Sequence, residues 1–126
     1  MSENSKPKVG SIVWQDLTVP DAGSVKDFYC DVIGWDAAPH DMSSYHDFDI
    51  KTAEDGEIIT GICHARGENA NLPPQWLIYV QVEDVDASAK RCLALDGQVL
   101  DGPRQMGEHR FCVVQDPAGA MLALIT

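Results

Sequence analysis

Several features that mark other classes of protein are missing from this sequence. No apolar run approaches the roughly 20 residues that cross a bilayer, so no membrane partner is expected. The N-terminus, MSENSKPK, lacks the apolar core of a secretion signal. The formal net charge is -11 and the nine Lys and Arg residues are scattered, which argues against binding nucleic acid. We therefore expect a cytoplasmic protein without nucleic-acid or membrane partners.

The motifs of several enzyme classes are absent as well. There is no G-x-S-x-G nucleophile motif and no glycine-rich phosphate loop, so nucleotide cofactors are not indicated. The four cysteines do not form a C-x-x-C pair, which favours buried, reduced thiols over a metal site. They are Cys30, Cys63, Cys92 and Cys112. The sequence thus predicts no cofactor.

What the sequence does contain is an internal repeat. Tyr45–Ile62 and Glu108–Ile125 each have the alternation of a hairpin around a turn, and they align at an offset of sixty-three residues. The same offset runs back through the preceding segment without a gap. It aligns Phe48 with Phe111, Gly56 with Gly119, Val19 with Val82, Asp21 with Asp84, and Gly34 with Gly97.

Each copy is predicted to have the order β-α-β-β-β. The first has a strand over Gly10–Val19 and a helix that begins at Asp21 and ends at Gly34, with the short strand and the hairpin after it. The second has a strand over Gln75–Val82 and a helix over Val85–Asp96. This gives one α+β domain over residues 1–126, with modules at about 9–65 and 75–126 joined by the linker RGENANLPPQ.

One helix covers only one face of a four-stranded sheet, so the other face of each module needs shelter. Two modules side by side would form a curved eight-stranded sheet with the helices outside. The concave inner face would then be a cleft for a small molecule.

The doubled β-α-β-β-β pattern, FYCDVIGW in the first copy and DPAGAMLALI at the end of the second resemble the vicinal oxygen chelate superfamily. This group includes glyoxalase I, extradiol dioxygenases and bleomycin-resistance proteins, and the resemblance covers Val9–Thr126. It implies the fold above, and it leaves the reaction open because one fold hosts many functions. Homodimers are common in the family, so a homodimer is expected.

The resemblance also implies four metal-binding positions, two in the first strands and two in the last strands of the modules. Here they correspond to Trp14, Leu77, Thr60 (four residues after Gly56) and Ala123 (four after Gly119). Zinc, nickel and iron need imidazole, carboxylate or thiolate ligands, which these residues do not supply. We therefore expect no metal, and a protein that binds a small organic molecule.

Strand alternation predicts which residues line the cleft. They are Trp14, Asp16, Thr18, Tyr45, Asp47, Asp49, Thr60, Ile62, His64, Leu77, Tyr79, Gln81, Arg110, Cys112, Met121 and Ala123, with Arg66 beside His64. Phe48 and Phe111 are expected under the helices, with His46 and His109 as structural residues at strand starts. His64 and Arg66 could hold a carboxylate or phosphate, or could simply end the strand in solvent.

Two other functions remain open. The first is a glyoxalase-like lyase or isomerase, with a displaced metal or with Asp16, His64 and Tyr79 as acid and base. The second is an interaction module whose cleft is filled by its own side chains. Trp14 is expected to be a stacking wall rather than a chemical group.

Overall fold

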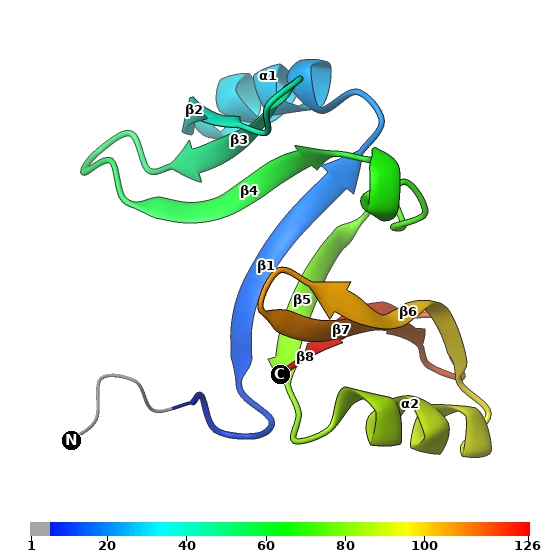
Figure 1. Cartoon of the computed structure of the whole chain (residues 1–126). Helices are drawn as coiled ribbons and strands as arrows, with labels where there is room; N and C mark the ends of the chain where they lie inside the picture. The colour runs from blue at the N-terminus through cyan, green and yellow to red at the C-terminus, as the bar shows by residue number, and fades with distance from the viewer. Residues whose placement is uncertain (1–5) are drawn as a thin grey trace. The chain divides into compact units, whose positions relative to one another are not determined.

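The computed structural model describes residues 6–126, which form two compact units. One unit is Gln15–Trp76, and the other combines the residues up to Trp14 with Leu77–Thr126. The strand order is β2-β3-β4-β1-β5-β8-β7-β6, with the β-α-β-β-β sequence twice along the chain (Figure 1). The predicted eight-stranded α+β fold is thus confirmed. No helix in the described residues is long and apolar enough to cross a bilayer.

The unit Gln15–Trp76 contains most of β1 and the next three strands. Its elements are β1 (Ile12–Val19), α1 (Ala22–Ile33), β2 (Asp36–Asp41), β3 (His46–Lys51), β4 (Ile58–His64) and the 3-10 turn η1 (Gly67–Asn69). Strand β1 runs parallel to β4, whereas β2, β3 and β4 pair antiparallel. Helix α1 packs on one face of this sheet, over a core of Leu17, Val19, Ala22, Ile50 and Ile62.

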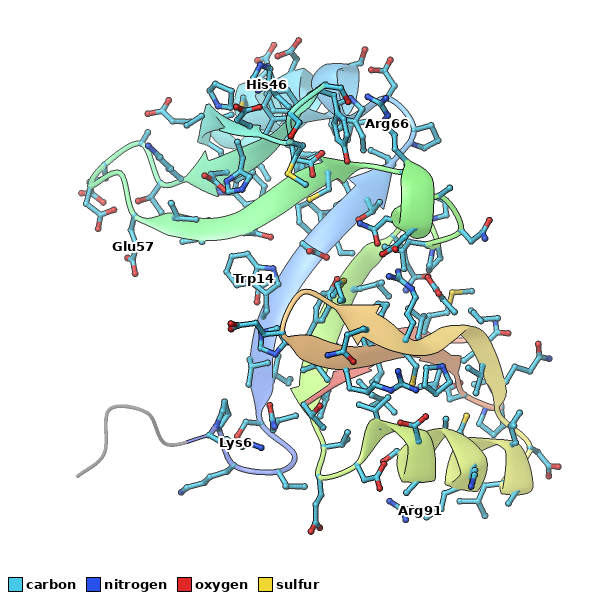
Figure 2. All side chains as sticks on the ribbon, in the orientation of Figure 1. Lys6, Trp14, His46, Glu57, Arg66 and Arg91 are labelled. Atoms are coloured by element: carbon cyan, nitrogen blue, oxygen red, sulfur yellow. The ribbon has the colours of Figure 1, made fainter. Side chains whose placement is uncertain are left out.

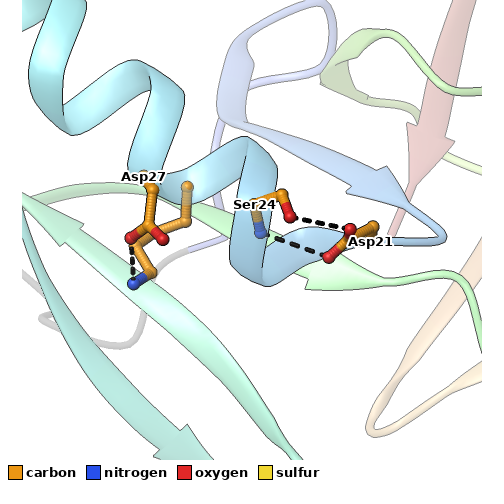
Figure 3. Close-up of polar contacts among 4 residues, drawn as sticks. Asp21, Ser24 and Asp27 are labelled. Atoms are coloured by element: carbon orange, nitrogen blue, oxygen red, sulfur yellow. Dashed lines mark hydrogen bonds and ion pairs between the residues drawn. The ribbon is translucent and has the colours of Figure 1, made fainter.

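The predicted ends of α1 are observed and have a physical cause. The Asp21 carboxylate accepts hydrogen bonds from the Ser24 backbone N–H at 3.2 Å and from its hydroxyl at 2.7 Å (Figure 3). Gly34 ends the helix in the left-handed conformation, with φ at 89°, which favours glycine. Asp84 caps α2 in the same way by accepting from the backbone N–H of Ala87.

The second unit contains the later strands. Its elements are β5 (Trp76–Gln81), α2 (Val85–Ala94), β6 (Gln98–Met106), β7 (His109–Gln115) and β8 (Met121–Ile125). Backbone hydrogen bonds from Gly10 to Gln81 and from Gln81 to Ser11 attach the start of β1 to β5, so this end of β1 belongs to the second unit. Helix α2 packs on one face, over a core of Val85, Ala89 and Cys112.

The strand pairings show that the gap-free repeat at offset sixty-three is wrong in the hairpins. In the first unit Leu17 pairs with Ile62, which pairs with Phe48. In the second unit Val80, sixty-three residues after Leu17, pairs with Leu124, which pairs with Cys112. Ile62 therefore corresponds to Leu124, an offset of 62, and Phe48 corresponds to Cys112, an offset of 64.

The first hairpin is therefore two residues longer than the second. One extra residue lies in the turn between β3 and β4, near Glu57 (Figure 2), which spans 52–57 against 116–120 in the second hairpin. The other is in β4, where the register shifts between Ile50 and Lys51 and one residue is skipped. The sequence did not reveal this because the turn glycines, Gly56 and Gly119, still align at sixty-three. A one-residue slip in register moves every side chain of a strand to the opposite face.

Candidate functional site

In the unit Gln15–Trp76, the sheet face opposite α1 is polar and acidic. Asp16 pairs with Gly61, which pairs with Asp49, and Thr18 pairs with Cys63. Asp47 lies on the same face, with 13% of its side chain exposed. Burial raises the pKa of the Cys63 thiol, and the carboxylates of Asp47 and Asp16 raise it further because they oppose a second negative charge.

The ends of β3 and β4 bring four of the predicted site residues together. We call Tyr45, Asp47, His64 and Arg66 the strand-end corner. The Arg66 guanidinium lies 4.0 Å from the ring centroid of Tyr45, and the His64 ring meets the same tyrosine edge-on at 5.6 Å. Asp47 Oδ1 accepts a hydrogen bond from the His64 backbone N–H at 2.8 Å and lies 3.4 Å from the ring atom Nδ1. In this corner, cationic and aromatic groups lie next to a carboxylate.

In the second unit, the face opposite α2 is apolar and aromatic. Tyr79 pairs with Ala123, which pairs with Val113, and all three are buried. Tyr79 stacks on Phe111, with ring centroids 5.8 Å apart and planes 30° apart. Leu77 is 2% exposed and Met121 is half-buried. Leu77, Tyr79 and Met121 thus belong to a dense wall.

An ion pair from β6 borders this wall. Arg104 Nε and Nη2 donate to the two carboxylate oxygens of Asp101 at 2.9 and 3.1 Å, and the guanidinium lies 5.0 Å from the Phe111 centroid. Gly102 lies between the pair with φ at +77°, and a Cβ there would come within 2.6 Å of the Phe111 carbonyl oxygen. Only glycine fits this close approach, so the sequence DGPR is the local signal for the ion pair. The sequence analysis did not predict this pair.

The observed registers correct the predicted faces of several residues. Ile62 packs with Ala22 in the core under α1, and Thr60 pairs with core residue Ile50 and donates its hydroxyl to the Gln15 carbonyl at 2.6 Å. Neither residue therefore lies on the face opposite α1. His64 follows Ile62 by two residues, so alternation alone would place it on the same face as Ile62. Because His64 is the last residue of β4, its ring instead lies in the strand-end corner.

In the second unit, the predicted faces of the β7 residues are also reversed. Cys112 packs under α2, and Arg110 forms a bidentate pair with Asp86 of that helix at 2.9 and 3.0 Å. Both residues were predicted to line the cleft. Phe111, predicted under the helix, instead stacks on Tyr79 on the opposite face. His46 and His109 do begin β3 and β7, as expected, and His109 contacts the Thr126 carbonyl at 2.8 Å.

Trp14 lies on β1, with its ring projecting from the strand (Figure 2). Its relative exposure is 38%, high for an indole on a central strand. The other two tryptophans have structural contacts. Trp76 Nε1 donates to the Tyr29 hydroxyl at 3.1 Å, and Trp35 and Trp76 pack against each other and against the core under α1.

The corrected register changes one of the four metal positions that the resemblance implied. Ala123 pairs with Tyr79, and the residue that pairs with Asp16 in the same way is Gly61 rather than Thr60. The four positions are then Trp14, Gly61, Leu77 and Ala123, and none of these side chains has an atom that binds a divalent cation. Within residues 6–126, no group of three or more His, Cys, Asp or Glu side chains could hold a metal ion. These residues do not fit the metal of the related enzymes.

Comparison with known proteins agrees with this architecture. Residues 9–124 match the family described as the Glyoxalase/Bleomycin resistance protein/Dioxygenase superfamily. The chain belongs to this superfamily. A solved structure of methylmalonyl-CoA epimerase from Mycobacterium tuberculosis is similar, with a TM-score of 0.52 and 13% identity, over 98% of this chain and 92% of that one. At this identity the likeness concerns the fold alone.

Curated relatives within the superfamily are somewhat closer in sequence. The anthracycline biosynthesis protein DnrV of Streptomyces peucetius is 28% identical over 131 residues, and CFP32 of Mycobacterium tuberculosis is 27% identical over 119 residues. These matches cover 91% and 94% of this chain. The chain spans about half the length of these relatives, 46% and 44% respectively.

Proposed function

We propose that this superfamily member binds a small organic molecule without a resident metal ion, with Trp14 as an aromatic wall for the ligand. The observation that carries the proposal is the side chain at the first metal position. An indole stands there instead of an imidazole or amide, and its exposed ring can stack on a planar ligand. The donor-free residues Gly61, Leu77 and Ala123 at the other positions support a role in binding.

The relative DnrV suggests the class of ligand. Its name connects it with anthracyclines, which are fused-ring aromatic molecules. A planar, conjugated ligand would gain most from an indole wall. The remaining predicted contacts combine aromatic and polar groups, which suits an aromatic body with a few hydrogen-bonding edges. They are Asp16, Tyr45, Asp47, His64, Arg66, Leu77, Tyr79 and Met121.

Fluorescence titration tests this proposal, using an anthracycline and a library of small aromatic molecules. Stacking and burial of such a ring contribute on the order of 1–3 kcal/mol, so Trp14→Ala should weaken binding roughly 5- to 150-fold. Trp35→Phe and Trp76→Phe are the controls, because these indoles belong to the aromatic cluster around Tyr29. A ligand that tolerates Trp14→Ala and is lost with Trp76→Phe would show that the binding wall is elsewhere.

The metal-free part of the proposal has a separate test. Purified protein should contain less than about a tenth of an equivalent of zinc, nickel, iron or manganese, because the four positions lack ligand atoms. Elemental analysis measures this directly. Metal near one equivalent, retained after removal of any affinity tag, would instead favour an enzyme with a displaced metal site.

An acid–base enzyme of the same fold is the second candidate function, and one contact favours it. The Asp47 carboxylate lies 3.4 Å from His64 Nδ1 without a hydrogen bond to it, and a small rotation of the ring would let the carboxylate orient the histidine for proton transfer. Such an enzyme would exchange a substrate C–H proton with deuterated solvent, and His64→Gln would abolish this exchange. Binding without exchange across the library would leave the ligand-binding function.

We further propose that the chain forms a homodimer, because sheet edges remain available at β2 and β6. Light scattering over a wide range of concentrations would test this. A mass that stays at the 13.8 kDa of one chain throughout would contradict it.

A further inference from the structure

We propose that the strand-end corner binds the oxyanion of a ligand, either a carboxylate or a phosphate. Arg66 supplies the positive charge, and the ring N–H of protonated His64 supplies a directed hydrogen bond. The inference goes beyond the proposed function, since it names an anion site that does not depend on the wall at Trp14. The corner lies within Gln15–Trp76 alone, so its geometry is independent of the second unit.

Arg66 is oriented while its hydrogen-bond donors stay available. Its guanidinium stacks at 4.0 Å from the Tyr45 centroid and is exposed (Figure 2). Within residues 6–126 it forms no ion pair and donates no side-chain hydrogen bond, whereas Arg104 and Arg110 each form a bidentate pair with an aspartate. A guanidinium presents five N–H donors in a planar fork that matches carboxylate and phosphate oxygens. Stacking on Tyr45 therefore holds a guanidinium with available N–H donors just after the end of β4.

His64 is held beside Arg66 by contacts on several sides. Its ring meets Tyr45 at 5.6 Å and Phe48 at 6.3 Å, and Asp47 lies at 3.4 Å from Nδ1. Nδ1 lies near this carboxylate but makes no hydrogen bond in the structure. When the ring takes up a second proton, Nε2 becomes an additional donor that can bind an anion.

Other charged groups near the ring fix the sign of the pH dependence. Asp47 comes from β3, Asp21 from the cap of α1 and Arg66 from the segment after β4. Hydrogen bonds from Ser24 lower the pKa of the Asp21 carboxyl, and the charge of His64 lowers it slightly further. A proton added to the imidazole brings a positive charge and a further N–H donor, so anion binding should strengthen at lower pH.

The position of the corner in the fold also favours an anion. Strands β1 and β4 are parallel and end together at Val19 and His64, next to the first turn of α1. Anions bind at the carboxyl ends of parallel strands, whereas the start of α1 is already capped by the Asp21 carboxylate. Arg66 and His64 are the basic groups of the corner, whereas Lys26 of α1 is already paired with Asp27 at 2.6 Å. This grouping contrasts with a chain that has 20 acidic residues and nine basic ones.

Nuclear magnetic resonance of the 15N-labelled chain tests the inference. Inorganic phosphate and acetate are titrated separately at constant ionic strength, and the signals of the His64 ring and the Arg66 Nε–H group are followed. One of the anions should produce saturable shifts of both signals. Arg66→Gln should weaken this binding about tenfold or more, because a charge-assisted hydrogen-bond donor is removed. Arg91→Gln is the matched control, since Arg91 is exposed on α2 and its guanidinium donates a hydrogen bond to the Ser88 hydroxyl at 3.4 Å.

Histidine variants test the predicted pH dependence. His64→Gln should remove the strengthening at lower pH, whereas His46→Gln should retain it because His46 is exposed at the start of β3. Arg66→Lys keeps the charge without the planar fork and should give an intermediate affinity. Circular dichroism and thermal unfolding of each variant separate a lost site from a lost fold.

Each outcome decides the inference. Tighter binding of phosphate identifies a phosphate-bearing ligand, and tighter binding of acetate identifies a carboxylate. Shifts that do not saturate, or that weaken equally with Arg66→Gln and Arg91→Gln, mean an adventitious ion only and overturn it. The failure of the proposed function looks different. Phosphate would then still bind the corner in wild-type and Trp14→Ala proteins, while no aromatic ligand responded to Trp14→Ala.

Discussion

The two units use the same strand pairings to present opposite chemistry. Asp16, Gly61 and Asp49 are joined by pairing in the first unit, and Tyr79, Ala123 and Val113 are joined in the same way in the second. Asp47 likewise corresponds to Phe111, next to the equivalent pair Phe48 and Cys112.

The faces that pack against the helices have stayed apolar in both units, with Leu17 and Ile62 matched by Val80 and Leu124. Helix packing restricts these positions to apolar side chains, whereas the opposite faces have diverged. The repeat therefore supplies one backbone with two different walls, one acidic and one aromatic.

The largest expected effect compares the equivalent residues Phe111 and Asp47. Phe111 is fully buried against Tyr79 and Arg104, so Phe111→Ala should lower the free energy of unfolding by about 3–5 kcal/mol. Asp47→Ala removes mainly the hydrogen bond to the His64 backbone and should cost about 1 kcal/mol. Urea unfolding measures both variants. Equal losses would mean that the acidic face also carries the stability of the fold.

A second comparison uses two glycines. Gly102 has φ at +77°, and a Cβ would come within 2.6 Å of a backbone oxygen, so Gly102→Ala should destabilise by about 2–3 kcal/mol. Gly61 has room for a Cβ, with its nearest neighbour at 3.6 Å, and Gly61→Ala recreates the residue at the equivalent position 123. It should change stability by less than about 1 kcal/mol. Thermal unfolding that ranks the two variants in the reverse order would contradict the assigned backbone.

Thiol reactivity should reveal the difference in charge between the faces. Burial raises the pKa of Cys112 to about 11, and burial together with Asp47 and Asp16 raises that of Cys63 further. Asp47→Asn removes one opposing charge, so iodoacetamide should alkylate Cys63 about three- to tenfold faster. Alkylation of Cys112 should be unchanged and serves as the internal control. Mass spectrometry of digested samples gives both rates, and equal acceleration of both thiols would indicate general loosening of the structure.

The smallest expected effect concerns the two helix caps. Hydrogen bonds from the Ser24 hydroxyl and backbone N–H lower the pKa of Asp21, whereas the equivalent of Ser24 in the second unit is Ala87. A lowered pKa gives stability that is complete above the ordinary carboxyl value and is lost as the pH falls through the folded value. Ser24→Ala should move the Asp21 titration upward and make stability less dependent on acid pH. Carbon-13 titration of the side-chain carboxyls measures this, and Asp84 should not move.

The sequence was sufficient for the elements and the module order, because these depend on local signals. Alternation, the caps at Asp21 and Asp84 and the stop at Gly34 each act within a few residues. The faces in the hairpins were not predictable in the same way. They depend on register, and the aligned glycines at 56 and 119 concealed a slip of one residue in each arm.

The candidate site shows the same division. Four predicted residues gather in the strand-end corner, Tyr45, Asp47, His64 and Arg66, because they lie close to two adjacent strand ends. Arg104 and Asp101 were missed because a close backbone approach at Gly102 brings them together, and periodicity does not report such an approach.

The longer first hairpin has a consequence for tracing the ancestry of this chain. If the modules arose by duplication of one gene segment, a net change of two residues between the paired arms preserves the alternation of both arms, whereas a net change of one would reverse the faces of one arm. Insertions or deletions of an even number of residues in this hairpin should therefore be tolerated more often than those of an odd number. Related genes should show hairpins that differ by pairs of codons, and phylogenetic alignments should open their gap within residues 52–59, over the turn and the start of β4.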